Sequence, residues 1–513
     1  ERFTDIPEWA KTELSGVFQA GIVAGTAPGV FSPNQNVTKN QMELFIDRVF
    51  SLYGTNLKDD FYAAVNKDKL NSLEIKPGRT ISGTLYDLND KSTENVDAII
   101  KEIIGGTYEA GSKEQKIADF YKNITDMESR NKVGIAPIQP YLDLVDSAKT
   151  TKDLINVQNT LSQEMYITPY MGFNLSVDLK DSTKYMPVFY TFSPSLPKDT
   201  YQNGTETQKN SYINYLKNLL VLGGEPEDNA AAMAQKCYDM EAEIASSMMN
   251  TEDGNNVDKI YNVFTMQEIK DMFPNVDIDA VFEASGLSKA DSFVIFDVER
   301  TKAFAGIFSD KNVETLKAWA KISLLSGWGG ALNQEFIDAA DKFNQEFMGT
   351  AGSYSLEERA AMTLQSTMPD YIGEIYAEKY FTEEAKQDVE KMVQDIISVY
   401  RKRIENLTWM GAATKERALK KLDTMGIKIG YPDKWETYLD GAEIQSAADG
   451  GSYFANMLEI AAAQREYTLS LQNKPVDKTQ WIMYPFTVNA CYSATQNDIT
   501  FPAAILQAPM YDV

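Results

Sequence analysis

Apolar residues recur at helical spacing along much of the chain, and the pattern is clearest between residues 382 and 407. The apolar positions there fall three or four residues apart, at Val389, Met392, Val393, Ile396, Ile397, Tyr400, Ile404 and Leu407. Acidic residues open this segment and basic residues close it, which suits the dipole of a helix. The pattern therefore predicts a long amphipathic helix over 382–407.

A shorter helix is predicted directly after it, over 415–425. Thr414 is a suitable N-cap residue for this helix, and Gly426 is a suitable exit. Helical patterns dominate from residue 59 to residue 438, whereas β-rich sequence is confined to about 174–190, 293–297 and the C-terminal stretch. The chain is therefore predicted to be mainly α-helical.

The first fifty residues carry the pattern of two helices joined by turn-forming residues. Thr38 and Gln41 can form a capping box at the start of the second helix. The apolar stripe of that helix consists of Met42, Phe45, Ile46, Val49 and Phe50. On this pattern alone, the segment is a generic pair of helices.

Composition and charge narrow the range of partners. The length of 513 residues suggests about three domains, with enough hydrophobic residues for sizeable cores. The 49 Lys and Arg against 74 Asp and Glu give a net charge of −25, which repels nucleic acid and anionic lipid. No run approaches the roughly 20 apolar residues of a membrane span. We therefore expect no nucleic acid partner and no membrane span.

The chain contains no histidine, and its two cysteines are Cys237 and Cys491. Ser-His-Asp and Cys-His catalysis and zinc held by histidine are therefore excluded for this chain alone. Two cysteines cannot make a disulfide framework, and we expect independent thiols.

Acidic residues supply the remaining candidate chemistry. Glu374 and Glu378 lie four residues apart on one predicted helix face, where they could be metal ligands, an acid/base pair or, more commonly, a solvated face. Residues 253–256 lack the ordered ligands of a calcium loop and are interpreted as a turn. A carboxylate-only hydrolase such as a glycosidase has no support from these spacings.

The order of motifs in residues 1–54 resembles the S-layer homology module. The matching positions are Phe3, Asp5, Ile6, Trp9, Ala10, Gly21, Ile22, Gly25, Phe31, Pro33, Val37, Thr38, Lys39 and Gln41. Such modules bind secondary cell-wall polymers of bacteria, so the resemblance implies a surface anchor and an extracellular location. Lys39 stands where the motif usually has Arg, and one copy is present where the family commonly has three.

Six ordered blocks farther along resemble the neprilysin family of zinc endopeptidases. The blocks are residues 59–66, 117–142, 258–265, 407–435, 488–492 and 499–507. The longest reads LTWM followed by TK, A, KL and IGYPDKW, and the last two read VNACY and ITFPAAILQ. Together they extend over about 450 residues in the order that the family has.

This resemblance implies a largely helical domain that covers a thermolysin-like catalytic domain and encloses a chamber for peptides. In the family, zinc is held by the two His of an HExxH helix and a later Glu, and all of these follow the FPA-x-ILQ block. The chain stops at Val513, directly after that block. We therefore expect no catalytic residue and no metal ligand in this chain, and zinc only in an intact enzyme.

One functional element of the family does fall within the chain. In the family, the Asn-Ala pair of the VNAYY strand lies at the edge of the active-site sheet, where the peptide substrate adds as a further strand. The matching positions are Asn489 and Ala490. An Asn carboxamide has donors and an acceptor for a peptide unit, and the small Ala490 leaves space for a side chain. Cys491 replaces the usual aromatic residue.

We expect three parts: an S-layer homology-like module (1–54), a largely helical cover domain (59–438), and the start of a thermolysin-like α/β catalytic domain (439–513). The corresponding function is part of a bacterial cell-surface zinc endopeptidase. Its expected partners are peptide substrates, the C-terminal catalytic segment and secondary cell-wall polymer. The alternative is a non-catalytic surface binding protein that reuses the peptidase fold.

Overall fold

The computed structural model describes residues 60–76, 81–350 and 352–512, together with Met42, Phe45 and Lys58. The chain divides into two compact units, Glu1–Ile75 and Lys76–Val513. In the first unit, helix α3 (Phe61–Ser72) begins after Asp60, whose carboxylate accepts a hydrogen bond from the N–H of Ala63 at 2.9 Å. Apart from Met42 and Phe45, which are helical, the helix pair predicted within residues 1–54 lies outside the described residues.

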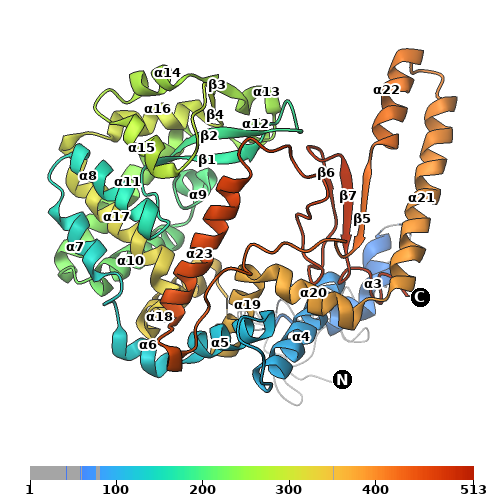
Figure 1. Cartoon of the computed structure of the whole chain (residues 1–513), viewed down its shortest axis with the longest axis horizontal. Coiled ribbons are helices and arrows are strands. Elements are labelled where there is room, and N and C mark those ends of the chain that lie inside the picture. Colours follow the sequence, from blue (N-terminus) through green and yellow to red (C-terminus); the bar gives the residue numbers. More distant parts are fainter. Residues whose placement is uncertain are drawn as a thin grey trace, which may run out of the picture. The chain divides into compact units, whose positions relative to one another are not determined.

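The second unit is mainly helical, which confirms the predicted fold class (Figure 1). Its first helices are α4 (Thr84–Ile104), α5 (Lys113–Thr125), α6 (Met127–Val133), α7 (Gln139–Ser147), α8 (Thr151–Glu164), α9 (Lys198–Asn203), α10 (Glu206–Leu222), α11 (Glu227–Ser247), α12 (Thr251–Gly254) and α13 (Val257–Ile260). They are followed by α14 (Met266–Met272), α15 (Ile278–Ser285), α16 (Val298–Ile307), α17 (Val313–Trp328), α18 (Gln334–Met348), α19 (Leu356–Thr367), α20 (Pro369–Tyr380), α21 (Glu383–Asn406), α22 (Ala412–Asp423) and α23 (Tyr453–Ser470). Short 3₁₀ turns span Asp310–Asn312, Gly329–Ala331 and Ala447–Asp449.

Local sequence explains where many of these helices begin. Capping boxes open α8, α10, α14 and α19, where a Ser or Thr pairs with an acidic residue or Gln three positions later. In α8, for example, the Thr150 hydroxyl accepts from the N–H of Asp153, while the Asp153 carboxylate accepts from the N–H of Thr150. Each box satisfies backbone donors that a helix leaves without partners in its first turn.

Two neighbouring helices test the sequence patterns directly. Helix α21 runs from Glu383 to Asn406 with Thr382 as its N-cap, so the long amphipathic helix is confirmed. Helix α22 runs from Ala412 to Asp423 with Gly411 as N-cap and Thr424 as C-cap, so the predicted N-cap at Thr414 and exit at Gly426 are wrong. The N–H of Lys415 already donates to the carbonyl of Gly411 at 3.0 Å, which places Thr414 inside the first turn.

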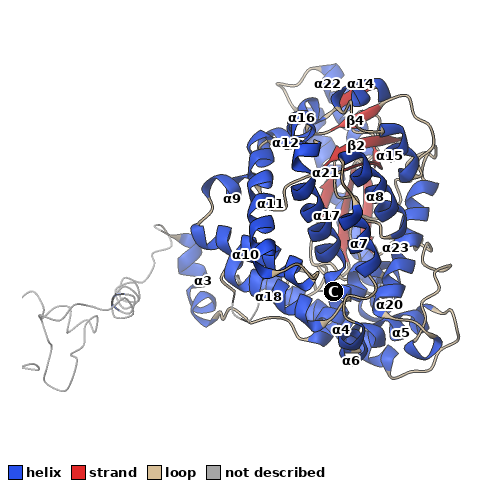
Figure 2. Cartoon of the chain, turned by 90° about the vertical axis from the view of Figure 1, so that its left-hand side faces the viewer, coloured by secondary structure: helices blue, strands red, loops and turns tan. Residues whose placement is uncertain are grey.

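The larger sheet has the strand order β1-β2-β4-β3. Its strands are β1 (Met171–Val177), β2 (Tyr185–Thr191), β3 (Asn262–Phe264) and β4 (Phe293–Ile295). The β-rich stretch near 174–190 is the antiparallel β1–β2 hairpin, in register from Met171 opposite Thr191 to Val177 opposite Tyr185. Figure 2 shows how few strands accompany the helices. Phe173 of β1 packs against the rings of Phe189 and Phe293 at 5.0 Å, which places aromatic residues at the centre of this part of the core.

Helix α23, drawn in red-orange in Figure 1, is fixed by an arginine that donates to two distant carbonyls. Arg465 donates to the carbonyl of Ser162 at the end of α8, and to that of Ala284 in α15, both at 2.6 Å. Arg130 makes the same kind of contact, since its guanidinium donates hydrogen bonds to the carbonyls of Leu332, Ile124 and Gly330. Such contacts satisfy a partly buried cation and join segments that lie far apart in the sequence.

Glu241 of α11 is a fully buried carboxylic acid. Its side chain accepts hydrogen bonds from the N–H of Ser195 and the hydroxyl of Tyr212, both at 2.8 Å. Burial raises the pKa of Glu241 to about 7. Because the folded chain favours the protonated form, this acid contributes stability at low pH that is lost as the pH rises through about 7.

Candidate functional site

A small second sheet, with strand order β5-β7-β6, contains the last strands of the described chain. Its strands are β5 (Gly426–Gly430), β6 (Cys491–Ser493) and β7 (Asp498–Pro502). β5 and β7 pair in parallel from Gly426 opposite Asp498 to Gly430 opposite Pro502, whereas β6 runs antiparallel to β7. Within the described residues β6 has a strand on one side alone, so it is an edge strand.

The two faces of this sheet differ in polarity. On one face Ile429 of β5 packs against Val389 and Val393 of α21, and all three are buried. On the other face lies a buried ion pair between Lys428 of β5 and Asp498 of β7. This alternation follows from the two-residue period of a strand.

The ion pair is compact and well hydrogen-bonded on the lysine side. The Lys428 Nζ lies 2.5 Å from an oxygen of Asp498, and the two side chains are 8% and 2% exposed. The ammonium also donates to the carbonyl of Gln480 at 2.6 Å and to the side-chain oxygen of Gln496 at 3.1 Å. Lys428 therefore joins β5, β7 and the segment that leads into β6.

The predicted substrate-binding residues lie at the start of the edge strand. Asn489 is exposed and Ala490 is partly buried, and both directly precede β6. The Asn489 carboxamide oxygen accepts from the N–H of Ala490 at 2.8 Å, and the N–H of Asn489 donates to the carbonyl of Thr487 at 3.0 Å. Among the described residues the carboxamide NH₂ of Asn489 has no hydrogen-bond partner, so it can donate to an added peptide.

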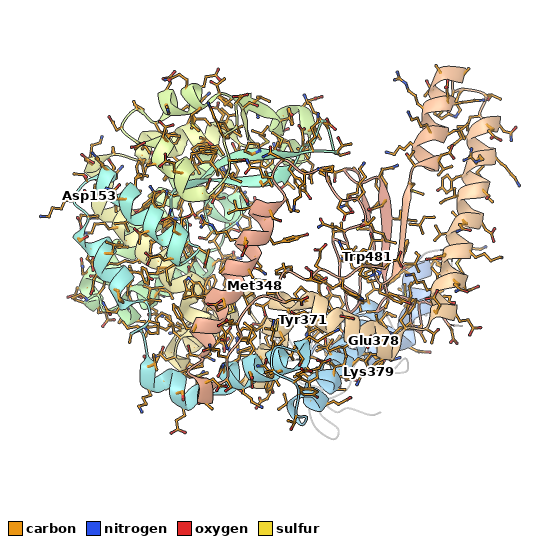
Figure 3. The ribbon with its side chains drawn as sticks, viewed as in Figure 1. Asp153, Met348, Tyr371, Glu378, Lys379 and Trp481 are labelled. Atoms are coloured by element: carbon orange, nitrogen blue, oxygen red, sulfur yellow. The ribbon has the colours of Figure 1, made fainter. Side chains whose placement is uncertain are left out.

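Residues of α23 line two cavities. The first, of about 410 Å³, is enclosed by parts of α8, β1, α15 and α23. The second, of about 360 Å³, lies between the start of α20, residues 432–438, α23 and residues 480–485. Trp481, labelled in Figure 3, lines the second cavity. Gln464 and Thr468 line both cavities, so the two adjoin along one helix.

Sequence patterns did not indicate these cavities, because the residues that line each one come from segments far apart in the chain. The first draws on residues from Gln158 to Leu469, and the second on residues from Asp370 to Pro485. The clearest signal available was the family resemblance, which implies a chamber but not its lining.

The acidic candidates of the sequence have other partners. Glu374 of α20 forms an ion pair with Lys113 at 2.5 Å, and Glu378, labelled in Figure 3, is exposed. Residues 253–256, predicted as a turn, comprise the end of the short helix α12 and the N-cap of α13, and Asp253 pairs with Lys259. Glu374 and Asp253 therefore serve in ion pairs, and Glu378 lies on an exposed helix face.

The residues present do not fit a zinc site. The chain has no histidine. Cys237 and Cys491 are both free thiols; Cys237 is buried, where it donates to the carbonyl of Thr315, and burial raises its pKa. Within residues 60–76, 81–350 and 352–512, no three His, Cys, Asp or Glu side chains are grouped to hold a metal ion. No step of a reaction is therefore assigned to zinc in this chain.

Comparison with known proteins shows which family this chain belongs to. The profile described as Peptidase family M13 matches residues 57–432, and the S-layer homology domain profile matches residues 2–43. The neutral endopeptidase of Lactobacillus helveticus is 28% identical over 471 residues, which cover 89% of this chain and 70% of that protein. Endothelin-converting enzyme 1 of Rattus norvegicus is 25% identical over 476 residues, which cover 88% and 61%.

Solved structures agree with the sequence comparison. The crystal structure of the Mycobacterium tuberculosis zinc metalloprotease ZMP1 with an inhibitor superposes with a TM-score of 0.80 at 26% identity, covering 89% of this chain and 69% of that one. PepO from Lactobacillus rhamnosis HN001 gives a TM-score of 0.81 at 22% identity, covering 90% and 72%, and so shares the fold.

The fold is therefore that of the neprilysin-like peptidases, as the six sequence blocks indicated. The chain belongs to peptidase family M13, whose profile covers well over half of its length, and it carries an S-layer homology domain at its N-terminal end.

We predict that the Lys428–Asp498 pair is required to hold the edge strand in place. The substitution Lys428→Met leaves the Asp498 carboxylate buried without its counter-ion, which costs about 3 kcal/mol or more of folding free energy. The double variant Lys428→Met/Asp498→Leu removes both charges and is expected to be more stable than the single variant. Urea unfolding of the three proteins measures this order, and equal stability of the single variant and the parent would contradict it.

Proposed function

We propose that residues 1–513 form the chamber wall and the substrate edge of a bacterial cell-surface zinc endopeptidase that hydrolyses oligopeptides. The observation that carries this proposal is the edge of β6 beside Asn489, which has no partner strand among the described residues, in a chain of peptidase family M13. An exposed strand edge presents backbone donors and acceptors that an extended peptide can satisfy.

The local geometry supports a role in peptide binding. β6 is fixed on its inner side by β7, so its outer side is a rigid template. The free NH₂ of Asn489 can donate to a peptide carbonyl, and Ala490 offers little steric hindrance beside it. The adjoining cavities along α23 provide space for substrate side chains.

The zinc of the intact enzyme would be held by residues outside 1–513, because this chain has no histidine. A catalytic segment that carries them would pack on the second unit. One surface is suited to such packing, since α21 exposes an apolar stripe of Met392, Ile396, Val399 and Tyr400, each close to half exposed. Burial of that stripe would be favourable by the hydrophobic effect.

Attachment to the cell wall is proposed from the S-layer homology domain, since such domains generally bind cell-wall polymers. The corresponding ligand is secondary cell-wall polymer, bound by residues 1–54, and the location is extracellular. None of the described helices is long and apolar enough to cross a membrane.

The peptide-edge proposal predicts an alternating response to backbone methylation. Alternate N–H groups of an added strand point toward β6, so N-methylation at one set of positions should weaken binding at least tenfold, while methylation of the other set should not. Titration calorimetry with an eight-residue peptide and its methylated forms measures the effect on the chain of residues 1–513. Equal losses for both sets would contradict strand addition.

The same titration tests Asn489. Asn489→Ala removes one hydrogen bond to the peptide and is expected to weaken binding about fivefold. Asn210→Ala is the matched control, because Asn210 is an exposed residue of α10 that lies away from both cavities. If Asn489→Ala bound the peptide as tightly as the parent does, Asn489 would not be part of the binding site.

We further predict that residues 1–513 alone hydrolyse no peptide. Purified chain would contain less than stoichiometric zinc by atomic emission and would leave an oligopeptide mixture intact by mass spectrometry. The neutral endopeptidase of Lactobacillus helveticus serves as the positive control. Stoichiometric zinc together with cleavage that a chelator abolishes would contradict the prediction.

The wall-anchor proposal predicts retention on bacterial wall preparations that still carry secondary polymer. The chain of residues 1–513 should sediment with them, whereas wall stripped of that polymer should retain little. A variant that lacks residues 1–54 should stay in the supernatant with both preparations. Equal retention with and without residues 1–54 would place wall binding elsewhere.

A further inference from the structure

The second cavity combines two carboxylates with several aromatic side chains. We name it the acidic aromatic pocket, and define it by Asp370, Glu436, Tyr438, Tyr467, Trp481 and Tyr484. These residues come from the start of α20, the segment after β5, helix α23 and the segment before β6. The pocket is therefore built by four separate parts of the fold.

The two carboxylates are close together and have no basic partner. An oxygen of Asp370 accepts from the N–H of Glu436 at 3.4 Å, and Glu436 accepts from the side-chain amide of Gln480 at 3.1 Å. Among the described residues neither carboxylate forms an ion pair with Lys or Arg, and Glu374, which also acts on Asp370, is already paired with Lys113. The pocket thus has two carboxylates that no Lys or Arg of the described residues pairs with.

Burial, together with the nearby charge of Glu436, raises the pKa of Asp370 to about 6. The Asp370 carboxyl is therefore mostly ionised at pH 7.5, at the cost of desolvation. A cation in the pocket would offset that cost, because an opposite charge favours the ionised form.

The one basic residue among those that line the pocket does not neutralise it. Lys434 is exposed, and its charge also acts on Asp477, whose pKa is lowered mainly by hydrogen bonds from Thr479. The described ion pairs of the protein include none between Lys434 and either carboxylate of the pocket.

The aromatic residues give the pocket a preference for cations over other ligands. The rings of Tyr438 and Tyr467 lie 5.3 Å apart with a tilt of 31°, and Trp481 and Tyr484 complete the wall. Ammonium and guanidinium groups are attracted to aromatic faces and form their strongest hydrogen bonds with carboxylates. An anion would be repelled, and a neutral group would leave the carboxylates uncompensated.

The pocket also lies close to the proposed peptide edge. Its last lining residue, Pro485, precedes Asn489 by four positions, which spans at most about 14 Å of extended chain. The carbonyl of Pro485 accepts from the N–H of Ala504, just after β7, at 2.8 Å, so this connection is held to the sheet. A peptide rises about 3.3 Å per residue, so the pocket is within roughly four residues of a peptide bound at Asn489.

We propose that the acidic aromatic pocket is a subsite for a positively charged group of the bound peptide, which is either a Lys or Arg side chain or the free N-terminal ammonium. This inference rests on the proposed function, since it takes the peptide at β6 as its ligand. It adds a preference for basic peptides, which a strand edge alone does not provide.

Matched eight-residue peptides test the subsite and distinguish the two sources of charge. In the first comparison, N-acetylated peptides that carry Lys at successive positions are compared with N-acetylated peptides that carry norleucine at the same positions. In the second, a norleucine peptide with a free N-terminus is compared with its N-acetylated form. We expect the best-placed cation to bind about tenfold more tightly than its neutral counterpart in titration calorimetry. Preference for Lys identifies a side chain, and preference for the free amine identifies the N-terminus.

Variants assign the preference to the pocket. The double variant Asp370→Asn/Glu436→Gln should lose the tenfold preference for the charged peptide over its neutral counterpart, measured as the ratio of the two affinities in the same variant. The single variant Glu436→Gln should reduce the preference for the charged peptide. Because Glu436 is partly exposed, this variant replaces the double variant if the latter fails to fold. Glu466→Gln is the matched control, because Glu466 is exposed on α23 and does not line the pocket.

The outcomes separate this inference from the proposed function. Equal affinities for charged and neutral peptides would overturn the cation subsite and leave peptide binding standing. If no peptide binds, the peptide edge fails, and the pocket is then tested by itself with N-acetyl-lysine methyl ester against its norleucine analogue by ligand-observed NMR. Binding of the lysine probe that the double variant abolishes would support the pocket, and its absence would overturn it.

Discussion

The buried pair of Lys428 and Asp498 is the interaction on which the candidate site depends. It lies between two parallel strands that are about seventy residues apart in the sequence, and the same ammonium holds the carbonyl of Gln480. The ammonium of Lys428 is satisfied by three acceptors, whereas one oxygen of the Asp498 carboxylate is buried without a hydrogen-bond partner among the described residues, so the carboxylate depends on its lysine. With β7 fixed in this way on β5, strand β6 has one paired side and one open side.

The open side of β6 and the cavities along α23 belong to one arrangement. Helix α23 is held by Arg465 against α8 and α15, and its other side faces the segment that runs into β6. In the proposed function, the strand edge supplies backbone groups that can pair with any extended peptide, whereas the cavities supply side-chain chemistry that can select among peptides. Rigid support of the residues that line it is what a binding site needs to be selective.

Much of the fold could be predicted from the sequence, because its signals are local or carried by family motifs. The apolar stripe and Thr382 define α21 correctly, and six ordered blocks led to the right family. The start of α22 was mispredicted, because Thr414 is a good cap residue by composition while the backbone places Gly411 there.

Asn489 and Ala490 were assigned to a strand from a motif, and the structure places them just before β6. The Lys428–Asp498 pair and the two cavities join residues from distant segments, so no local pattern could indicate them.

The buried acid Glu241 has a consequence for the thermodynamics of the whole second unit. Near pH 6 the folded chain carries a proton there that the unfolded chain, with an ordinary carboxyl, gives up to solution. Denaturation is then coupled to proton release, and the released proton is taken up by the buffer. The heat of unfolding recorded in a calorimeter at that pH therefore includes the ionisation enthalpy of the buffer, so cacodylate and imidazole solutions of one protein would yield different values.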